Sequence, residues 1–108
     1  MRNSIFITAA LKLTSLAEQK ITSWPLKDKA RISFWIKDIP QKTFPCEIQD
    51  SGKFDKVEIE HEVSIMLPLE AESILFKNSI FYIGVNHEPI GIGHIMDITS
   101  RDSVQSVN

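Results

Sequence analysis

The sequence predicts an all-β domain, built as a small antiparallel barrel or sandwich. Three observations support this class: several short segments rich in β-branched and aromatic residues, one stretch in which apolar and polar residues alternate, and the absence of any long run with helical spacing. Short irregular connections join the segments, which is typical of antiparallel architectures. At 108 residues, with 43% hydrophobic residues, the chain can bury one hydrophobic core.

The first half contains three predicted strands. Residues 5–14 and 31–37 combine β-branched and aromatic side chains. A third strand is predicted at residues 44–48, where Pro45 indicates an edge or a bulge because proline cannot donate a hydrogen bond to a sheet. After the first strand, residues 15–18 have the form of a capping box, so at most one helical turn is expected there.

The clearest alternation lies in the second half, at residues 57–65. A strand there would end at Pro68, and it would be half-buried because its two faces differ in polarity. One face carries Val57, Ile59, His61, Val63 and Ile65, and the other carries Glu58, Glu60, Glu62 and Ser64.

Two further strands are predicted near the end of the chain, at residues 81–85 and 90–98, joined by a short turn. The preceding residues 69–76 are compatible with a loop or with one helical turn. Residues 99–108 are polar and are predicted to form a frayed tail. The sequence therefore indicates one barrel or sandwich domain over residues 1–98.

The Gly91-Ile92-Gly93 sequence has two interpretations. It could begin a Gly-x-Gly-x-x-Gly loop that holds a nucleotide phosphate, or it could belong to a strand that packs closely against its neighbours. Met96 occupies the place of the third glycine, and the residues after it are β-prone, whereas the phosphate loop needs a following helix. The strand interpretation is favoured, and no nucleotide cofactor is predicted.

Catalytic and metal chemistry are not indicated by the pattern of residues. Cys46 is the only cysteine, which excludes an internal disulfide and a thiolate zinc cage and is consistent with the cytoplasm. In a strand, His61 projects away from the glutamates on either side of it, so these residues do not form a metal site. No signal-peptide pattern and no apolar run of membrane-spanning length is present. The chain is therefore predicted to be a cytoplasmic, non-enzymatic protein without metal or cofactor.

Charge is distributed unevenly along the chain. Residues 1–45 contain eight Lys/Arg and three Asp/Glu, whereas residues 46–108 contain four and eleven. Within the acidic half, Glu58, Glu60 and Glu62 form either a solvated strand face or an acidic stripe that recognises a basic partner.

The basic half suggests a different partner. Cations interleaved with aromatic residues bind nucleic acid, and Trp24 and Trp35 lie near the basic residues, although both fit the core or rim of a barrel equally. The pI of about 5.9 and the lack of an RNA-binding signature favour a protein partner over nucleic acid. The basic residues are Lys20, Lys27, Lys29 and Arg31.

The closing stretch carries a family resemblance. Phe81, Ile83, Ile90, Gly91, Gly93 and Ile95 match the pattern Phe-x-Ile-Arg-Glu-Gly-x-x-x-Val/Ile-Gly-x-Gly-x-Val/Ile without a gap. This pattern ends the C-terminal β-barrel, domain 3, of elongation factor Tu and related translation GTPases, which the chain therefore resembles. Three further matches precede it in the family's order: an opening strand at residues 10–13, a strand around Arg31 and a strand ending in proline at residues 63–68. Together they cover about residues 5–98.

The resemblance implies a six-stranded antiparallel barrel that is used for macromolecular contacts. The family's Gly-Gly-Arg turn is absent, its Gly-Tyr-Arg-Pro-Gln segment retains only Arg31, and its Arg-Glu-Gly is replaced by residues 84–86, Gly-Val-Asn. In the family these positions contact the GTPase domain, tRNA or the exchange factor. Their loss, and a length too short for a GTPase domain, mean that these roles are not carried over.

The expected function is non-catalytic binding of a protein partner, for example neutralisation of a toxin by a cognate immunity protein. The acidic stripe is the predicted contact surface for that partner. The alternative is an RNA- or ribosome-associated accessory of translation that uses Lys27, Lys29 and Arg31. Neither function is expected to involve a membrane.

Overall fold

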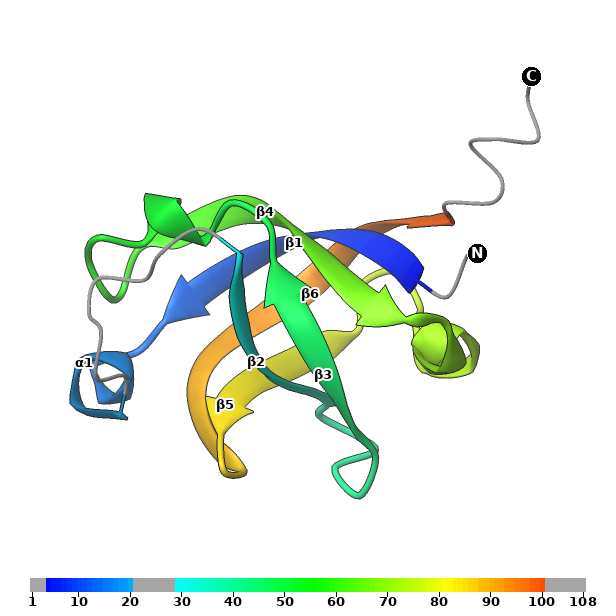
Figure 1. The fold of residues 1–108 in the computed structure, drawn as a ribbon, viewed down its shortest axis with the longest axis horizontal. Coiled ribbons are helices and arrows are strands. Elements are labelled where there is room, and N and C mark those ends of the chain that lie inside the picture. The colour runs from blue at the N-terminus through cyan, green and yellow to red at the C-terminus, as the bar shows by residue number, and fades with distance from the viewer. Residues whose placement is uncertain (1–3, 21–28, 101–108) are drawn as a thin grey trace.

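Six antiparallel strands form a closed barrel in the computed structural model, which describes residues 4–20 and 29–100 (Figure 1). The strands are β1 (Ser4–Leu13), β2 (Ala30–Ile36), β3 (Thr43–Ile48), β4 (Glu60–Pro68), β5 (Ile80–Val85) and β6 (Glu88–Ser100). Their order around the barrel is β1-β4-β3-β2-β5-β6, and every hydrogen-bonded pair is antiparallel. The predicted all-β class and six-stranded antiparallel barrel are therefore confirmed, and the sandwich alternative is excluded.

The described residues also form three short helices, α1 (Leu16–Lys20), η1 (Ser51–Lys53) and η2 (Leu69–Ile74). Helix α1 is the single helical turn expected after the first strand. The sequence of residues 69–76 is compatible with a loop or a helical turn, and η2 shows that the helical turn is formed. These two lie at opposite ends of the barrel (Figure 1), where they bury Ala17 of α1 and Ala71 and Ile74 of η2. None of the helices in the described ranges is long and apolar enough to cross a membrane.

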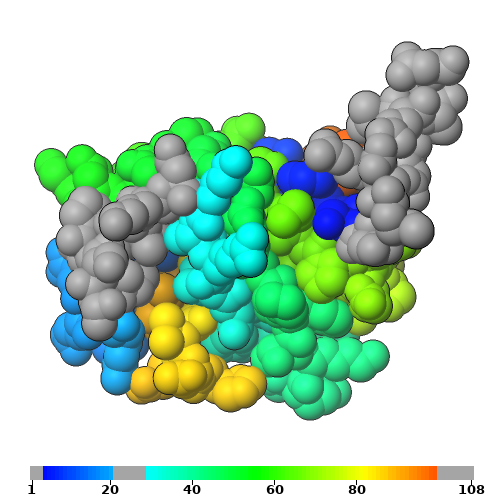
Figure 2. All heavy atoms as spheres, viewed as in Figure 1, coloured from blue at the N-terminus to red at the C-terminus, as the bar shows by residue number. Residues whose placement is uncertain are grey.

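Side chains fill the interior of the barrel. Successive strand residues point to opposite faces, and every second residue of β1 from Ile5 to Leu13 is almost fully buried. Phe34 of β2 and Phe81 of β5 stack in the core with ring centroids 4.8 Å apart. Figure 2 shows the side chains of β2, β3 and β4 covering one face of the molecule. Because even an eight-stranded barrel is only wide enough for side chains or one small ligand, binding surfaces have to lie outside this core.

The last strand closes the barrel. β6 pairs with β1 on one side and with β5 on the other. Each of the two ladders contains one shift of register, which in the β1–β6 ladder lies between Thr8 and Ala9. Such bulges bend a strand and increase its twist, as closure requires. Gly91 and Gly93 lie within β6, as the strand interpretation predicted, and not in a phosphate-binding loop.

Both glycines lie on the interior face of β6, where a side chain has little room. A Cβ atom at Gly93 would lie 2.5 Å from the carbonyl oxygen of Ala10 and 2.7 Å from Cζ of Phe81. At Gly91 it would lie 2.8 Å from Cδ2 of Leu13, a contact that a side-chain movement can relieve. The close approach of β6 to β1 therefore depends more on Gly93 than on Gly91.

The predicted strand at residues 57–65 begins later than expected. β4 starts at Glu60, and Glu58 lies in the irregular segment before it. Glu58 has a φ angle of 65°, a conformation that few non-glycine residues adopt, and its N–H donates to the Leu13 carbonyl at 2.6 Å. The prediction that Glu58 shares a strand face with Glu60 and Glu62 is therefore wrong, because this bond to the end of β1 turns the chain before the strand begins.

The barrel also extends slightly beyond its predicted limit at residue 98. β6 continues through Ser100, and Thr99 and Ser100 are still paired with β1. The rest of the predicted tail, residues 101–108, lies outside the described residues.

Replacing Gly93 with alanine is expected to lower the free energy of unfolding by about 1–3 kcal/mol, the usual effect of overpacking a core. The backbone oxygen of Ala10 cannot move aside, whereas the side chains around Gly91 can, so Gly91→Ala should be the milder change. Urea denaturation of both variants would measure the difference. A Gly93→Ala variant as stable as the wild type would contradict the close approach of β6 to β1.

Candidate functional site

The predicted acidic stripe is reduced to two glutamates. Glu60 and Glu62 lie together on the outer face of β4, while the Glu58 carboxylate accepts a hydrogen bond from the Ser15 N–H at 3.2 Å. Lys12 lies directly opposite Glu60 in the register of β1 and β4, and opposite charges at such positions attract one another. The negative charge on this face is therefore smaller than the sequence predicted.

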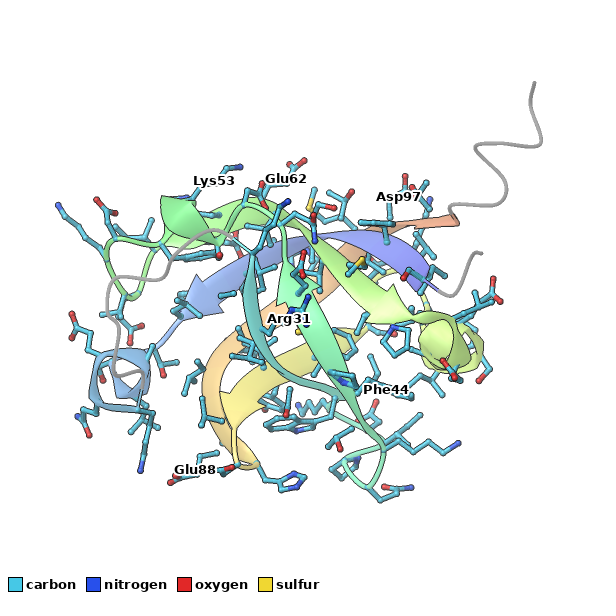
Figure 3. All side chains as sticks on the ribbon, viewed as in Figure 1. Arg31, Phe44, Lys53, Glu62, Glu88 and Asp97 are labelled. Atoms are coloured by element: carbon cyan, nitrogen blue, oxygen red, sulfur yellow. The ribbon has the colours of Figure 1, made fainter. Side chains whose placement is uncertain are left out.

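A second cation lies beside the same pair of glutamates. Lys53 Nζ donates to the Glu62 carbonyl oxygen at 2.8 Å and forms an ion pair with Asp50 at 3.2 Å. Figure 3 shows Lys53 and Glu62 near one another along this edge of the molecule. With Lys12 on the opposite side, the surface around Glu60 and Glu62 is mixed in charge rather than acidic.

The structure describes only some of the predicted basic residues. Lys27 lies outside the described ranges. Lys29 is exposed just before β2 with a φ angle of 61°, and Arg31 is exposed on the outer face of β2. Lys20 of α1 forms an ion pair with Glu88 at 2.9 Å. Because β3 lies between β2 and β4, Arg31 and the two glutamates of β4 belong to separate parts of the surface.

Among the described residues, Arg31 has a side-chain partner at one nitrogen only. Its Nε donates to Oε1 of Glu47, directly opposite in β3, at 3.3 Å, and Gln49 Nε2 donates to the other carboxylate oxygen at 2.8 Å. The Glu47 side chain is 12% exposed and the Arg31 side chain is 83% exposed. No other hydrogen bond or ion pair engages this guanidinium among the described residues. Its terminal nitrogens are thus available for a carboxylate, which a guanidinium binds through paired N–H groups.

A groove opens on the outer face where β3 and β4 stop pairing. Their ladder ends at Glu47 and Met66, and its continuation would place Pro45 opposite Pro68. Neither proline has an N–H to donate, so the pairing cannot continue. The groove has a volume of about 260 Å³ and is lined by Ser4, Arg31, Pro45, Cys46, Glu47, Met66, Leu67 and Pro68.

A second groove of about 330 Å³ adjoins the first on the other side of Arg31. It opens because β2 pairs with β5 only from Ser33 onward, opposite Gly84. Arg31 and Pro45 line both grooves, so the two form one surface, called here the Arg31 groove. In Figure 2, β2 and β3 lie side by side on this face, and Figure 3 places Arg31 near its centre. The second part is lined by Arg31, Ile32, Ser33, Pro45, Gly84, Val85 and Asn86.

The histidines do not form a metal site with other residues in the described part of the chain, where no group of three or more His, Cys, Asp or Glu could hold a metal ion. His61 is half-buried and packs edge-on against Phe54 with ring centroids 5.0 Å apart. His87 lies in the turn between β5 and β6, 6.4 Å from Trp35. Trp35 is only 7% exposed, so it packs on the barrel wall rather than offering a stacking platform, and Trp24 lies outside the described ranges.

Cys46 is a buried residue of β3 and is not suited to nucleophilic chemistry. Burial raises the pKa of its thiol to about 12, although a backbone hydrogen bond with Ile32 acts in the opposite direction. The thiolate, which is the reactive form, is therefore scarce at neutral pH. Cys46 contributes to the wall of the Arg31 groove as a small apolar side chain.

The chain matches no protein-family model, and no curated protein is significantly similar to it. The closed six-stranded barrel is thus shown by the structure alone. A function has to be inferred from the groups that the barrel presents on its surface.

The sequence identified Arg31 as a candidate binding residue but did not indicate the groove around it. Pro45 inside a strand-like run predicted an edge or a bulge, which indicates only that strand pairing is interrupted near this residue. Nothing in the sequence shows that Pro45 and Pro68 face one another, because the register between two strands depends on packing and on the connecting turns. Glu47 and Met66 were missed for the same reason.

Cys46 is expected to resist alkylation in the folded protein, because it is buried and its pKa is raised to about 12. Iodoacetamide should modify the urea-denatured chain much faster than the native chain, which mass spectrometry would measure. Equally fast labelling of the native protein would show that the groove wall opens.

Arg31→Gln is expected to change the free energy of unfolding by less than about 1 kcal/mol, because exposed ion pairs contribute little to stability. Thermal or urea denaturation would measure this difference. Phe34→Ala is the control, since removing a buried phenylalanine should cost about 3–5 kcal/mol. A large loss for Arg31→Gln would mean that the Arg31–Glu47 pair holds β2 and β3 together.

Proposed function

We propose that this protein is a non-catalytic binding module that recognises a protein partner through the outer surface of its barrel. The Arg31 groove carries this proposal: it is an external groove lined largely by apolar groups, with one exposed guanidinium at its rim. Protein interfaces combine such apolar surfaces with arginine and contain few other charges at their centre. The filled interior supports the same conclusion, because the core leaves the outer face as the place for contacts.

We also propose that the barrel is related to domain 3 of elongation factor Tu. The closed six-stranded antiparallel architecture supports this, as does the placement of Phe81 and Ile83 in β5 and of Gly91 and Gly93 in β6. Where the family has Arg-Glu-Gly, this chain has residues 84–86 at the β5–β6 turn. The family's contacts to a GTPase domain and to tRNA are therefore not part of the proposal.

Neutralisation of a toxin, as by a cognate immunity protein, is one form that this function would take. Glu60 and Glu62 would then meet basic groups on the toxin. Because Lys12 and Lys53 lie beside these glutamates, the main contact is placed at the Arg31 groove. A cytoplasmic location is proposed, since a single unpaired cysteine is usual there.

An RNA- or ribosome-associated role is the second candidate. The exposed Lys29 and Arg31 favour it, because cations supply most of the affinity for a phosphate backbone. The Glu47 carboxylate next to Arg31 and the apolar lining of the groove weigh against it. Surfaces that bind nucleic acid gather several cations with aromatic platforms.

Capture from a cell lysate would separate the two candidates. The immobilised protein is expected to retain its partner after nuclease treatment, and to retain less of it when Arg31 is replaced by glutamine. Lys29→Gln is a matched control, because it removes a nearby exposed charge that does not line the groove. Loss of the partner after nuclease would overturn the protein-binding proposal in favour of RNA.

Reversing the two charges of β4 tests the acidic surface separately. A Glu60→Lys, Glu62→Lys double variant is expected to keep most of the captured partner, because the cations beside these residues already reduce their field. The amount of partner retained would be compared with that of the wild type at low and high salt. If the double variant loses the partner and Arg31→Gln keeps it, the contact lies on β4.

A further inference from the structure

We propose that the Arg31 groove binds an extended peptide segment of the partner, with an aspartate or glutamate carboxylate held by Arg31 and an aliphatic side chain in the apolar part of the groove. This inference rests on the proposed protein-binding function and names the chemistry that the surface would recognise.

A row of small side chains forms the floor of the groove. The strand registers place Ser4 opposite Pro68, and Ser33 opposite both Pro45 and Gly84. Extending the β3–β4 ladder joins Pro45 to Pro68. The row therefore crosses the outer face from β1 to β5 through both parts of the Arg31 groove, and the Trp35 indole packs against Gly84 at its β5 end.

Larger side chains stand along one side of this row. On one side Arg31, Glu47 and Met66 are neighbours in the registers of β2, β3 and β4. On the other side Trp35 lies opposite Thr43, but Trp35 is only 7% exposed and packs against Gly84, so no second wall projects there. A groove that crosses the strands with one raised side suits an extended chain, which can lie along that side, better than a helix, which is about 10–12 Å wide.

The lining selects for aliphatic side chains next to the guanidinium. Pro45, Cys46, Met66, Leu67 and Pro68 supply apolar atoms at the β3–β4 end of the groove. Burying an aliphatic side chain against such atoms is favourable, and methionine adapts its shape to different ligands. The aliphatic group of the peptide is therefore placed on the β4 side of Arg31.

The Arg31–Glu47 pair selects for a single carboxylate. Glu47 holds Nε of Arg31 at 3.3 Å and orients the side chain, while no described residue bonds the terminal nitrogens, which suit a paired contact. Orienting the guanidinium before binding reduces the entropy lost when a ligand docks. The phosphodiester backbone of a nucleic acid, with a negative charge on every nucleotide, would meet the Glu47 carboxylate beside Arg31, whereas one carboxylate can approach the open side of the fork.

Another groove offers no comparable indication of a ligand. It has a volume of about 390 Å³ and lies between α1 and the β5–β6 hairpin, and none of the described residues that line it is charged. It provides a reference surface for the test below. Its lining residues are Thr14, Ser15, Leu16, Tyr82, Pro89, Gly91 and Ile92.

Selection of linear peptides from a random phage-displayed library, against the folded wild-type protein, would test this inference. The enriched peptides are expected to share an aspartate or glutamate beside an aliphatic residue. One of them would be synthesised with an acetylated N-terminus and an amidated C-terminus, so that its only carboxylates are on side chains. Isothermal titration calorimetry would then measure its dissociation constant for the wild type and the variants.

Arg31→Gln is expected to weaken peptide binding by about tenfold or more, because a charge-assisted paired contact is lost. Arg31→Lys should recover part of the affinity, since it keeps the charge without the planar fork. Lys29→Gln should stay within about twofold of the wild type, as a surface substitution outside the groove. In the wild type, the amide NMR shifts caused by the peptide should centre on Ser33, Met66 and Gly84.

Four results would overturn the inference: no enrichment of any peptide, enrichment of peptides without an acidic residue, full affinity of the Arg31→Gln variant, or shifts centred on Leu16 and Ile92. If the captured protein partner binds the Arg31→Gln variant normally, the protein-binding function stands and only this groove assignment is wrong. If a single-stranded oligouridine binds the groove more tightly than the peptides, the ligand is nucleic acid and both proposals fail.

Discussion

Barrel closure by β6 is the constraint on which the other features depend. The strand pairs with β1 and β5 at once, and it approaches β1 so closely that Gly93 has no room for a side chain. Closure gives every strand a neighbour on both sides and lets all six strands share one core. The stacked Phe34 and Phe81 rings are fully buried in that core, so contacts with another molecule have to use the outer surface.

The outer face gains its main groove from a local failure of strand pairing. Pro45 and Pro68 would meet in the β3–β4 ladder, and neither can donate the hydrogen bond that would continue it. The closed barrel tolerates this gap because β3 remains paired with β2, and β4 with β1, along most of their lengths. The unpaired residues around Pro45 and Pro68 add few hydrogen bonds to the sheet. They can therefore form a binding surface, with Arg31 and Glu47 at its rim.

The candidate site was only partly predictable from the residues. Arg31 could be identified, because it belongs to a group of basic residues near the two tryptophans and matches an arginine of the family that the chain resembles. The acidic stripe could not be predicted correctly, since alternation alone does not reveal that Glu58 adopts a positive φ angle and bonds to the end of β1. No local pattern in the sequence marks Glu47 or Met66 as a site residue. They line the groove because the strand registers place Glu47 between Arg31 of β2 and Met66 of β4.

The sequence by itself determined the all-β class, the approximate positions of the six strands and the strand role of Gly91 and Gly93. These features follow from local rules, because β-branched and aromatic residues, period-two alternation and turn residues act over a few neighbouring positions. Only the tertiary structure decided the order of the strands, the start of β4 and the groove beside Arg31. Which outer side chains meet depends on the register between strands far apart in the sequence, and packing of the whole core sets that register.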